Sequence, residues 1–454
     1  MKVLVIGSGA REHALCRSLA ADPSVDAVWA APGNPGMEQV ARCRPLPGGV
    51  TDAAAVTALA AEVGADLVVV GPEAPLVAGV ADALRERGIA CFGPSAAAAR
   101  LEGSKAFAKE VMAAADVPTA MSRVCTRLSQ VTDALDAFGA PHVVKDDGLA
   151  AGKGVVVTDQ RTQALAHAAH CLDTHDPDDP DKRARGTAHE PEPEGVEHRV
   201  VVEEYLDGPE LSVFCLTDGT TVVPLAPAQD FKRAGEGGTG PNTGGMGAYS
   251  PLDWAPADLL DEVVTRIAQP TIDEMRRRGT PFVGVLYVGL ALTSRGPRVV
   301  EFNARFGDPD GQACLARLET PLGGLLLAAA TGALAEHPPL RWREDHAVTV
   351  VLASRGYPEN PRTGFPITGL DDLAGLGEDV YVLHAGTKRT ADGTLVSSGG
   401  RVLDVVALGA DLAQARERAY TALDTIHLEG AHCRRDIGLA AERGTVTVPS
   451  PSGA

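Results

Sequence analysis

Two lysines in a glycine-rich segment are the first residues whose types and spacing could do chemistry. Lys145 ends one apolar run, and Lys153 lies just before the next run begins at Val155. A glycine-rich loop between two strands can close over phosphates with backbone N–H groups, while lysines offset the phosphate charge. It is not a Walker A loop, in which Gly-Lys-Ser/Thr opens a helix. The segment indicates a phosphate site, since a plain flexible hairpin does not account for both lysines.

An acid and an amide two residues apart form a second candidate site. Glu301 and Asn303 lie in an apolar run, so their side chains point to one face of a strand. Oxygen ligands of this kind suit magnesium that arrives with substrate phosphates. Arg305 lies on the same face if the strand continues, and it could stabilise charge on a transferring phosphoryl group. The alternative is a half-exposed strand with its polar residues facing solvent.

Two further segments have the composition of binding loops. Residues 200–210 form a strand that runs into a linker, where backbone groups could pair with an adenine edge and Glu210 with ribose hydroxyls. The glycine-rich residues 240–248 follow Lys232 and Arg233. Glycine allows the backbone to approach a ligand closely, which favours a binding loop over a flexible linker.

The first turn of the chain, residues 7–12, follows a strand and opens a helix. Such a turn presents N–H groups and a positive helix end to an anion. A dinucleotide fingerprint, however, needs glycine where Glu12 stands and an acid at the end of the second strand, which reads Trp29-Ala30-Ala31. NAD is therefore disfavoured. A mononucleotide or sugar-phosphate site and a simple tight turn both remain open.

The elements that must position these residues change type along the chain. The first hundred residues alternate strands with helices of about ten residues, which predicts a parallel sheet with its ligand crevice at the carboxyl ends of the strands. Residues 76–87 are expected to form one helix. Residues 173–197 hold nine acidic residues, three basic residues and four prolines, which predicts a mobile surface loop. Residues 282–292 and 298–302 are expected to pair as strands, and a further unit begins near Trp342.

Length and composition limit the number of domains and exclude several classes of protein. A chain of 454 residues suggests about three domains. No apolar run reaches the roughly 18 residues of a membrane span, and the N-terminus lacks the pattern of a secretory signal. The net charge of −19 argues against binding a nucleic-acid backbone. The eight cysteines contain no Cys-x-x-Cys pair, which favours reduced thiols in the cytoplasm over a zinc site or disulfides.

Taken in order, these segments closely resemble the glycinamide ribonucleotide synthetases (phosphoribosylamine–glycine ligases) of the ATP-grasp superfamily. The resemblance runs from about residue 1 to 437, and so many ordered motifs are specific where any one would be weak. The motifs are GSGAREHA (7–14), PGNPG (32–36), GPEAPL (71–76), LEGSKAF (101–107), KDDGLAAGKGV (145–155), VEEYLDGPE (202–210), GPNTGGMGAYSP (240–251), EFNARFGDP (301–309), HAGTK (384–388), SGGRVL (398–403) and CRRDIG (433–438).

The resemblance implies a multidomain fold of the α/β and α+β classes. It implies an N-terminal Rossmann-like parallel sheet over residues 1–103 and an ATP-grasp domain of two α+β subdomains over 104–330, with a lid over about 121–205. A small mixed α/β domain would cover 331–442, before a tail at 443–454. The implied reaction ligates glycine to 5-phospho-β-D-ribosylamine, the second step of de novo purine biosynthesis. It consumes ATP through a glycyl phosphate intermediate, with magnesium or manganese, in a cytoplasmic monomer without nucleic-acid or membrane partners.

Site residues follow from the resemblance position by position. Arg305 and Lys145 would be catalytic, and Glu301 and Asn303 would hold the metal. The ATP site would comprise Lys105, Lys145, Gly152, Lys153, Gly154, Glu203, Glu204, Tyr205, Leu206 and Glu210. The phosphoribosylamine site would comprise Gly9, Asn34, Gly36, Pro72, Glu73, Asn242, Thr243, Gly244, Gly245, Met246, Gly247 and Asp308, together with Arg305.

Three departures from the family pattern leave alternatives open. Asp310 stands where the family usually has a glutamate, Phe231 stands where a histidine is common, and the acidic residues 173–197 replace a short connection. Other readings are an ATP-grasp ligase with a different acceptor, such as a bicarbonate-using purine or biotin carboxylase, an NAD-linked oxidoreductase, and a catalytically silent nucleotide-binding protein.

Overall fold

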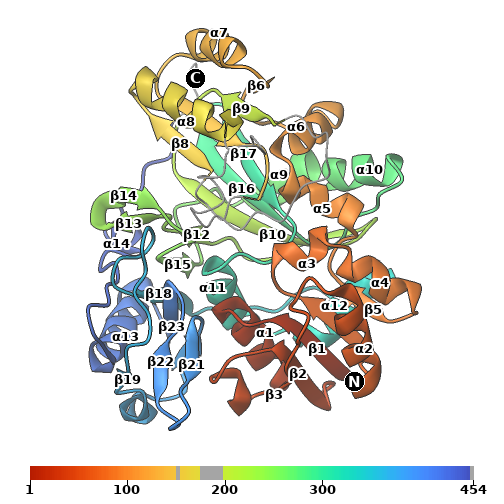
Figure 1. The fold of residues 1–454 in the computed structure, drawn as a ribbon, viewed down its shortest axis with the longest axis vertical. Coiled ribbons are helices and arrows are strands. Elements are labelled where there is room, and N and C mark those ends of the chain that lie inside the picture. The colour runs from red at the N-terminus through yellow and green to blue at the C-terminus, as the bar shows by residue number, and fades with distance from the viewer. Residues whose placement is uncertain (150–153, 174–197, 450–454) are drawn as a thin grey trace.

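The N-terminal unit is a parallel sheet flanked by helices. In the computed structural model, which describes residues 1–149, 154–173 and 198–449, five strands lie in the order β3-β2-β1-β4-β5 (Figure 1). The chain builds outward from β1 to β3 and then returns to the other side of β1, which creates a switch point where ligands bind in such sheets. These strands are β1 (Lys2–Gly7), β2 (Ala27–Pro32), β3 (Arg42–Cys43), β4 (Leu67–Val70) and β5 (Ala90–Phe92).

The helices of this unit match the sequence pattern with one correction. α1 (Ala10–Ala20) and α2 (Ala53–Val63) have 11 residues each, close to the expected length of about ten. The single helix expected over 76–87 is instead two helices, α3 (Glu73–Val77) and α4 (Val80–Glu86). The break falls at Gly79, whose φ of 84° lies in the left-handed region and interrupts helical hydrogen bonding.

The central unit is built on an antiparallel sheet in the order β11-β10-β16-β17. The expected pairing of residues 282–292 with 298–302 is confirmed, because β16 and β17 are antiparallel neighbours. The strands are β10 (Glu210–Asp218), β11 (Val222–Pro224), β16 (Val283–Thr293) and β17 (Gly296–Asn303). Beside them lie α5 (Ala96–Gly103) and α6 (Lys105–Ala114), whose N-caps Ser95 and Ser104 accept hydrogen bonds from helix N–H groups.

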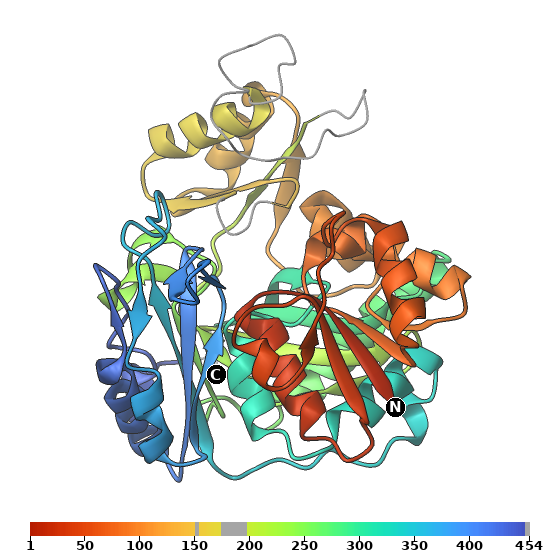
Figure 2. The same cartoon turned by 60° about the horizontal axis from the view of Figure 1, so that its bottom comes forward.

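A smaller layer, built from the strands and helices described between residues 122 and 203 and named the lid below, lies at the top of the molecule in Figure 2. Its antiparallel sheet has the order β6-β9-β7-β8, formed by β6 (Ser122–Cys125), β7 (His142–Asp146), β8 (Val155–Thr158) and β9 (Val200–Glu203). The helices α7 (Leu128–Phe138) and α8 (Arg161–Asp173) cover one face. On the other face, Val124 lies beside Val201 and Val157 beside Val143. Val124 and Val157 are exposed.

The C-terminal sheet combines strands from two parts of the chain. Its order is β12-β15-β18-β23-β20, with α13 (Leu412–Thr425) packed against it. β18 (His346–Ala353), β20 (Val380–His384) and β23 (Arg401–Gly409) come from the predicted C-terminal domain. β12 (Gln229–Asp230) and β15 (Gly247–Ser250) precede it, so the sheet crosses the boundary predicted at 330/331.

Two further observations concern the cysteines and the apolar content of the helices. The eight cysteines all lie within the described residues, form no disulfide, and six of them are buried. No helix in the described parts of the chain is long and apolar enough to cross a membrane. Residues 174–197, which hold nearly all of the predicted acidic loop, and the end of the tail at 450–454 lie outside the described residues.

Candidate active site

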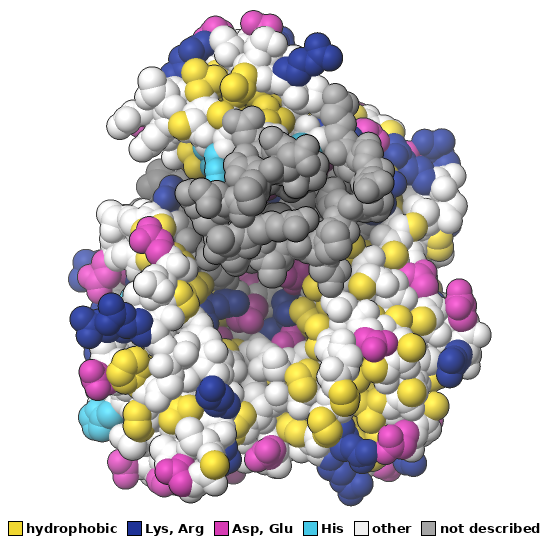
Figure 3. All heavy atoms as spheres, in the orientation of Figure 1, with side chains coloured by type: hydrophobic (Ala, Val, Ile, Leu, Met, Phe, Trp, Pro, Cys, Tyr) yellow, Lys and Arg dark blue, Asp and Glu magenta, His cyan; other side chains and the backbone are white. Residues whose placement is uncertain are grey.

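A cavity of about 330 Å³ lies where the N-terminal unit, the lid and the central sheet meet. Figure 3 shows basic and acidic side chains gathered in a hollow at the middle of this face. Twelve of the residues predicted from sequence line it: Pro72, Glu73, Lys105, Lys145, Gly154, Glu203, Thr243, Gly244, Glu301, Asn303, Arg305 and Asp308.

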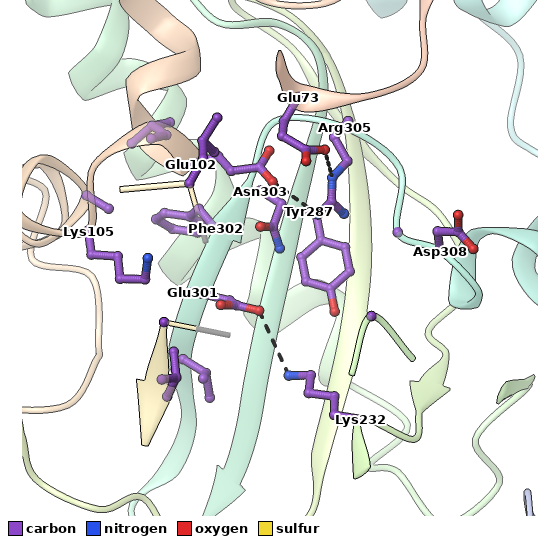
Figure 4. A pocket seen from close by; sticks show the side chains of 18 of the residues that line it. Glu73, Glu102, Lys105, Lys232, Tyr287, Glu301, Phe302, Asn303, Arg305 and Asp308 are labelled. Atoms are coloured by element: carbon purple, nitrogen blue, oxygen red, sulfur yellow. Dashed lines mark hydrogen bonds and ion pairs between the residues drawn. The ribbon is translucent and has the colours of Figure 1, made fainter. Parts of the chain in front are cut away.

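The strand β17 carries Glu301 and Asn303 into the cavity, as their spacing predicts (Figure 4). Gly289 lies opposite Glu301 on β16, and a Cβ there would lie 3.3 Å from Glu301 Cγ, so the glycine leaves room for the acid. Lys232 Nζ lies 2.8 Å from Glu210 Oε2 and 3.9 Å from Glu301 Oε1. Burial alone would raise the pKa of Glu301, but the charges of Lys232 and two further lysines hold it below its ordinary value.

Three lysines gather at the lid side of the cavity. Lys145 of β7 donates to Val300 O at 2.9 Å and lies 2.8 Å from Glu203 Oε2. Lys109 of α6 lies 2.9 Å from the other oxygen, Glu203 Oε1. Burial would raise the pKa of Glu203, but the two lysines outweigh it and lower the pKa. Lys105 donates to Gly148 O at 2.8 Å, and burial lowers its pKa.

Arg305 lies between two carboxylates at the opposite end (Figure 4). Its Nη2 is 3.0 Å from Glu102 Oε1 and its Nε is 3.3 Å from Glu73 Oε2. Glu102 also accepts a hydrogen bond from the backbone N–H of Ala304 at 2.7 Å. Burial raises the pKa of Glu102 to about 7 despite the arginine. Burial acts the same way on Glu73, but Arg305 and Arg11 lower its pKa below the ordinary value.

The glycine-rich loop, residues 240–248, meets the segment after β17 and the C-terminal sheet at Asp308. Arg401 of β23 donates from Nη1 to Gly244 O and to Asp308 O, both at 2.6 Å. Its Nη2 lies 3.3 Å from Asp308 Oδ2. Gly245 has a φ of +109°, and a Cβ there would lie 2.3 Å from Pro309 Cδ, so this close approach requires glycine.

Of the first turn, residues 7–12, only Arg11 lines the cavity. The Gly9 N–H donates to Glu12 Oε2 at 2.7 Å, and a Cβ on Gly71 would lie 2.2 Å from Glu12 Oε1. Glu12 therefore occupies the anion position at this helix end, which gives a physical reason why a dinucleotide is disfavoured. Asn34 donates to Ser8 O at 2.9 Å and to His384 O at 2.8 Å, so it ties the turn to the C-terminal sheet.

Other predicted residues lie outside the cavity lining or outside the described residues. Glu204 pairs with Arg295 at 2.9 Å, and Tyr205 is half-exposed. Gly152 and Lys153 lie outside the described residues. The remaining predicted residues that do not line the cavity are Gly9, Asn34, Gly36, Leu206, Glu210, Asn242, Gly245, Met246 and Gly247.

The two single-residue departures from the family pattern have different surroundings. Asp310 lines the cavity, is buried, and accepts a hydrogen bond from Ser212 Oγ at 2.6 Å. Burial raises its pKa. Phe231 does not line the cavity; its ring packs under the Arg434 guanidinium, with 4.9 Å between Cζ and the ring centroid. Phe231 therefore has a packing role in this chain.

Several cavity residues were not assigned from sequence. Lys109 follows Lys105 by one helical turn on α6, a spacing that places both on one face and could have been noticed. Glu102 belongs to the motif at 101–107 and Arg401 to the motif at 398–403. No local pattern in either motif predicts a contact with Arg305 or Asp308. The other unassigned polar lining residues are Arg11, Asp230, Lys232 and Tyr287.

Three sequence models of one family cover most of the chain. The phosphoribosylglycinamide synthetase N domain matches residues 1–102, its ATP-grasp (A) domain matches 103–311, and its C domain matches 347–440. The phosphoribosylamine–glycine ligase of Streptomyces coelicolor is 62% identical over 442 residues, covering 97% of this chain and 99% of that protein. The protein of the same name from Mycobacterium tuberculosis H37Rv is 56% identical, covering 99% and 100%.

The comparison with solved structures agrees with the comparison of sequences. The crystal structure of phosphoribosylamine–glycine ligase from Thermotoga maritima superposes with a TM-score of 0.78 at 31% identity, covering 96% of this chain and 100% of that one. The biotin carboxylase domain of Hydrogenobacter thermophilus 2-oxoglutarate carboxylase gives a TM-score of 0.69 at 16% identity, covering 95% and 91%. This last likeness concerns the fold alone.

Proposed function

This chain belongs to the phosphoribosylglycinamide synthetase family, and on that premise we propose that it ligates glycine to 5-phospho-β-D-ribosylamine, with ATP as energy source, giving glycinamide ribonucleotide, ADP and phosphate. The observation that carries the proposal at residue level is the convergence of Lys105, Lys145, Glu301 and Asn303, from three separate segments, on one cavity.

The chemistry requires activation of a carboxylate. Glycine's carboxylate attacks the γ-phosphoryl group of ATP, giving glycyl phosphate and ADP. The amine of phosphoribosylamine then attacks the acyl carbon, and phosphate leaves. No nucleophilic side chain is needed, so the protein contributes positioning, charge compensation and exclusion of water.

The lysines are proposed to hold the phosphates of ATP. Lys105 and Lys145 line the cavity, and Lys145 is fixed by Glu203 on one side and Val300 O on the other. Since the carboxylate of Glu203 is occupied by two lysines, the adenine would contact the backbone of residues 204–206 rather than this side chain. Val155, the register partner of Lys145 on β8, also lines the cavity and offers an apolar surface for a planar base.

Glu301 and Asn303 fit a divalent ion. They project from one face of β17, and the lowered pKa of Glu301 keeps its carboxylate ionised. Within the described residues no cluster of three or more His, Cys, Asp or Glu side chains could hold a metal, so phosphate oxygens and water would complete the coordination. Magnesium or manganese bound there would offset negative charge on the phosphates. Lys232, 3.9 Å from Glu301, compensates the acid when no ion is bound.

The acceptor is proposed to lie at the end of the cavity formed by Glu73, Thr243, Gly244 and Asp308, next to Arg305. The two carboxylates beside Arg305 raise its pKa against the effect of burial, so it remains a cation throughout the reaction. We propose that Arg305 orients the reacting groups and stabilises charge on the phosphoryl group in transfer. Gly9, Asn34 and Gly36 would support this end from outside the cavity lining.

The setting of the reaction is also a proposal. A cytoplasmic location agrees with eight cysteines that form no disulfide. We propose that the protein acts as a monomer, which size-exclusion chromatography with light scattering checks.

The test is ADP release measured with ATP, magnesium, glycine and freshly generated phosphoribosylamine. Release must depend on glycine, and glycinamide ribonucleotide must form only when both co-substrates are present. Bicarbonate-dependent phosphate release would instead favour a carboxylase, and ATP binding without turnover would favour a silent protein. Glu301→Ala, with the fold checked by circular dichroism, should abolish product formation.

A further inference from the structure

Four side chains form a ring at and behind the cavity wall, which the backbone of β23 completes between Arg401 and Asp404. Asp308 and Arg401 line the cavity, whereas Gln312 and Asp404 lie behind them. Gln312, on α11 (Asp310–Arg317), donates from Nε2 to Asp308 Oδ1 at 2.7 Å and to Asp404 Oδ2 at 2.9 Å. Asp404 and Arg401 are both on β23, and Arg401 contacts Asp308 Oδ2. Both carboxylate oxygens of Asp308 are therefore held.

Asp404 lies in apolar surroundings. It is 1% exposed, and its register partners are Val351 on β18 and Leu383 on β20. The charged groups that act on it are Asp308 and Arg401. Since a carboxylate in such a place is costly in its ionised form, burial and the charge of Asp308 raise the pKa of Asp404 to about 8.

Two oxygens in this ring lack partners. Asp404 Oδ1 and Gln312 Oε1 are buried, and neither has a hydrogen bond within the described part of the chain. These oxygens belong to the same two side chains, Gln312 and Asp404, that the hydrogen bond from Nε2 to Oδ2 already joins. An ionised carboxylate offers only acceptors, so it cannot satisfy an amide oxygen. A proton on Oδ1 would turn one unsatisfied acceptor into a donor for the other.

This proton gives the ring complete pairing. The acid and the amide then share two hydrogen bonds in a closed pair, and the second hydrogen of Nε2 remains for Asp308. Reversing the amide would place its oxygen against Asp308 Oδ1 and Asp404 Oδ2, both of which are acceptors. The observed orientation is therefore the one that satisfies every group.

We propose that Asp404 is a protonated positioning residue, paired with Gln312 as a carboxylic acid with an amide, and that the pair fixes Asp308 and Arg401 for binding of the acceptor amine. Asp404 acts through Gln312 and does not touch the substrate. The identity of the acceptor rests on the proposed function, whereas the proton and the pairing do not.

The first test compares Asp404→Asn with Asp404→Ala in the full chain. Asparagine offers one donor and one acceptor to Gln312 without a proton, so it preserves the pair, whereas alanine removes it. Asp404→Ala should raise the KM for phosphoribosylamine roughly 10- to 100-fold while the KM for ATP stays near that of the parent. Asp404→Asn should restore most of this loss. Equal impairment of both variants would overturn the pairing.

The second test is the pH profile. Between about pH 7 and about pH 9.5, kcat/KM for the amine should fall for the parent relative to Asp404→Asn, because only the parent loses the proton. The ratio of the two proteins cancels titration of the substrates themselves. Asp22→Asn is the matched control, since Asp22 is a buried carboxylate that binds Ser24 N and Gly323 N far from the cavity. Asp22→Asn should show the same pH dependence of kcat/KM as the parent. If the ratio of kcat/KM between the parent and Asp404→Asn does not change with pH, the protonation of Asp404 is contradicted.

The third test does not need turnover. The difference between the infrared spectra of the ligand-free parent and Asp404→Asn at neutral pH should contain the band of a protonated carboxylic acid. The difference between the parent and Asp22→Asn should lack it, because other acids with a raised pKa, such as Glu102, are common to these proteins. Identical spectra for the parent and Asp404→Asn would contradict the proposal. If the band is present but the parent makes no glycinamide ribonucleotide, the proposed function fails and the protonated pair stands.

Discussion

Lys145 of β7 and Glu203 of β9 form a buried ion pair, with 2.8 Å between Nζ and Oε2. Lys109 of α6 approaches the other carboxylate oxygen at 2.9 Å. A single acid thus holds two lysines from different elements at the lid side of the cavity. The arrangement joins the lid sheet to the helix that carries Lys105, so the lysines that we propose to bind phosphate and the lid share one electrostatic support.

Replacing this acid should destabilise the protein. Glu203→Gln leaves two buried ammonium groups facing each other without a counter-charge, which should cost about 3 kcal/mol or more. Urea unfolding at neutral pH measures the change, and the KM for ATP should rise as well. Glu204→Gln is the control, because Glu204 pairs with the partly exposed Arg295 and should cost at most about 1 kcal/mol. Equal losses for both variants would contradict the buried triad.

Loss of the metal-binding acid should remove catalysis with little effect on folding. Glu301→Gln takes one charged ligand from the divalent site, and kcat should fall roughly 100- to 1000-fold. Removing the metal with EDTA should abolish turnover of the parent, and added magnesium should restore it. Glu262→Gln, which breaks a surface pair with Arg266, should leave kcat unchanged. Normal turnover of Glu301→Gln would show that the ion lies elsewhere.

Glu102 should make folding stability depend on pH. Its pKa is raised from 4.5 to about 7, so the folded state disfavours its ionised form. Stability from this group is full below pH 4.5 and is lost as pH rises toward 7, by about 1.4 kcal/mol per pH unit at most. Glu102→Gln should remove that slope in urea unfolding measured across the interval.

Glu73 provides the matched control for this slope. It contacts the same arginine as Glu102, but its pKa is shifted in the opposite direction. Its pKa is lowered from 4.5, so its contribution is present above that value and is lost as pH falls through the lower, folded-state pKa. Glu73→Gln should change stability in the acid range, and between pH 4.5 and 7 it should reduce the slope without removing it, because burial, the larger cause of the raised pKa of Glu102, remains. The same pH response in both variants would refute the assignment.

Phe231→His should affect stability more than catalysis. The ring packs under Arg434 and does not line the cavity, so kcat/KM at pH 8 should remain near that of the parent. The half-buried polar ring should cost about 1 kcal/mol or more. Below the ordinary histidine pKa of about 6.5 the loss should grow, since an imidazolium would face a guanidinium. A large fall in kcat at pH 8 would place this residue in the active site instead.

The sequence by itself determined the local features of this protein. The alternation of apolar and polar residues placed Glu301 and Asn303 on one face of β17, and the apolar runs located the strands that carry Lys145 and Glu203. Periodicity and glycine-rich turns act over a few residues, so they can be recognised without the fold. The prediction of a single helix over 76–87 was wrong because Gly79 adopts a left-handed conformation, which a periodic pattern of apolar residues does not reveal.

Only the tertiary structure decided which distant groups meet. The contacts of Arg305 with Glu102 and of Arg401 with Asp308 join segments far apart along the chain. β12 and β15 joined the C-terminal sheet across the predicted boundary. Such partners are selected by packing of whole elements and by compensation of buried charge. Both depend on the complete arrangement of the core, and no spacing within a single segment encodes them.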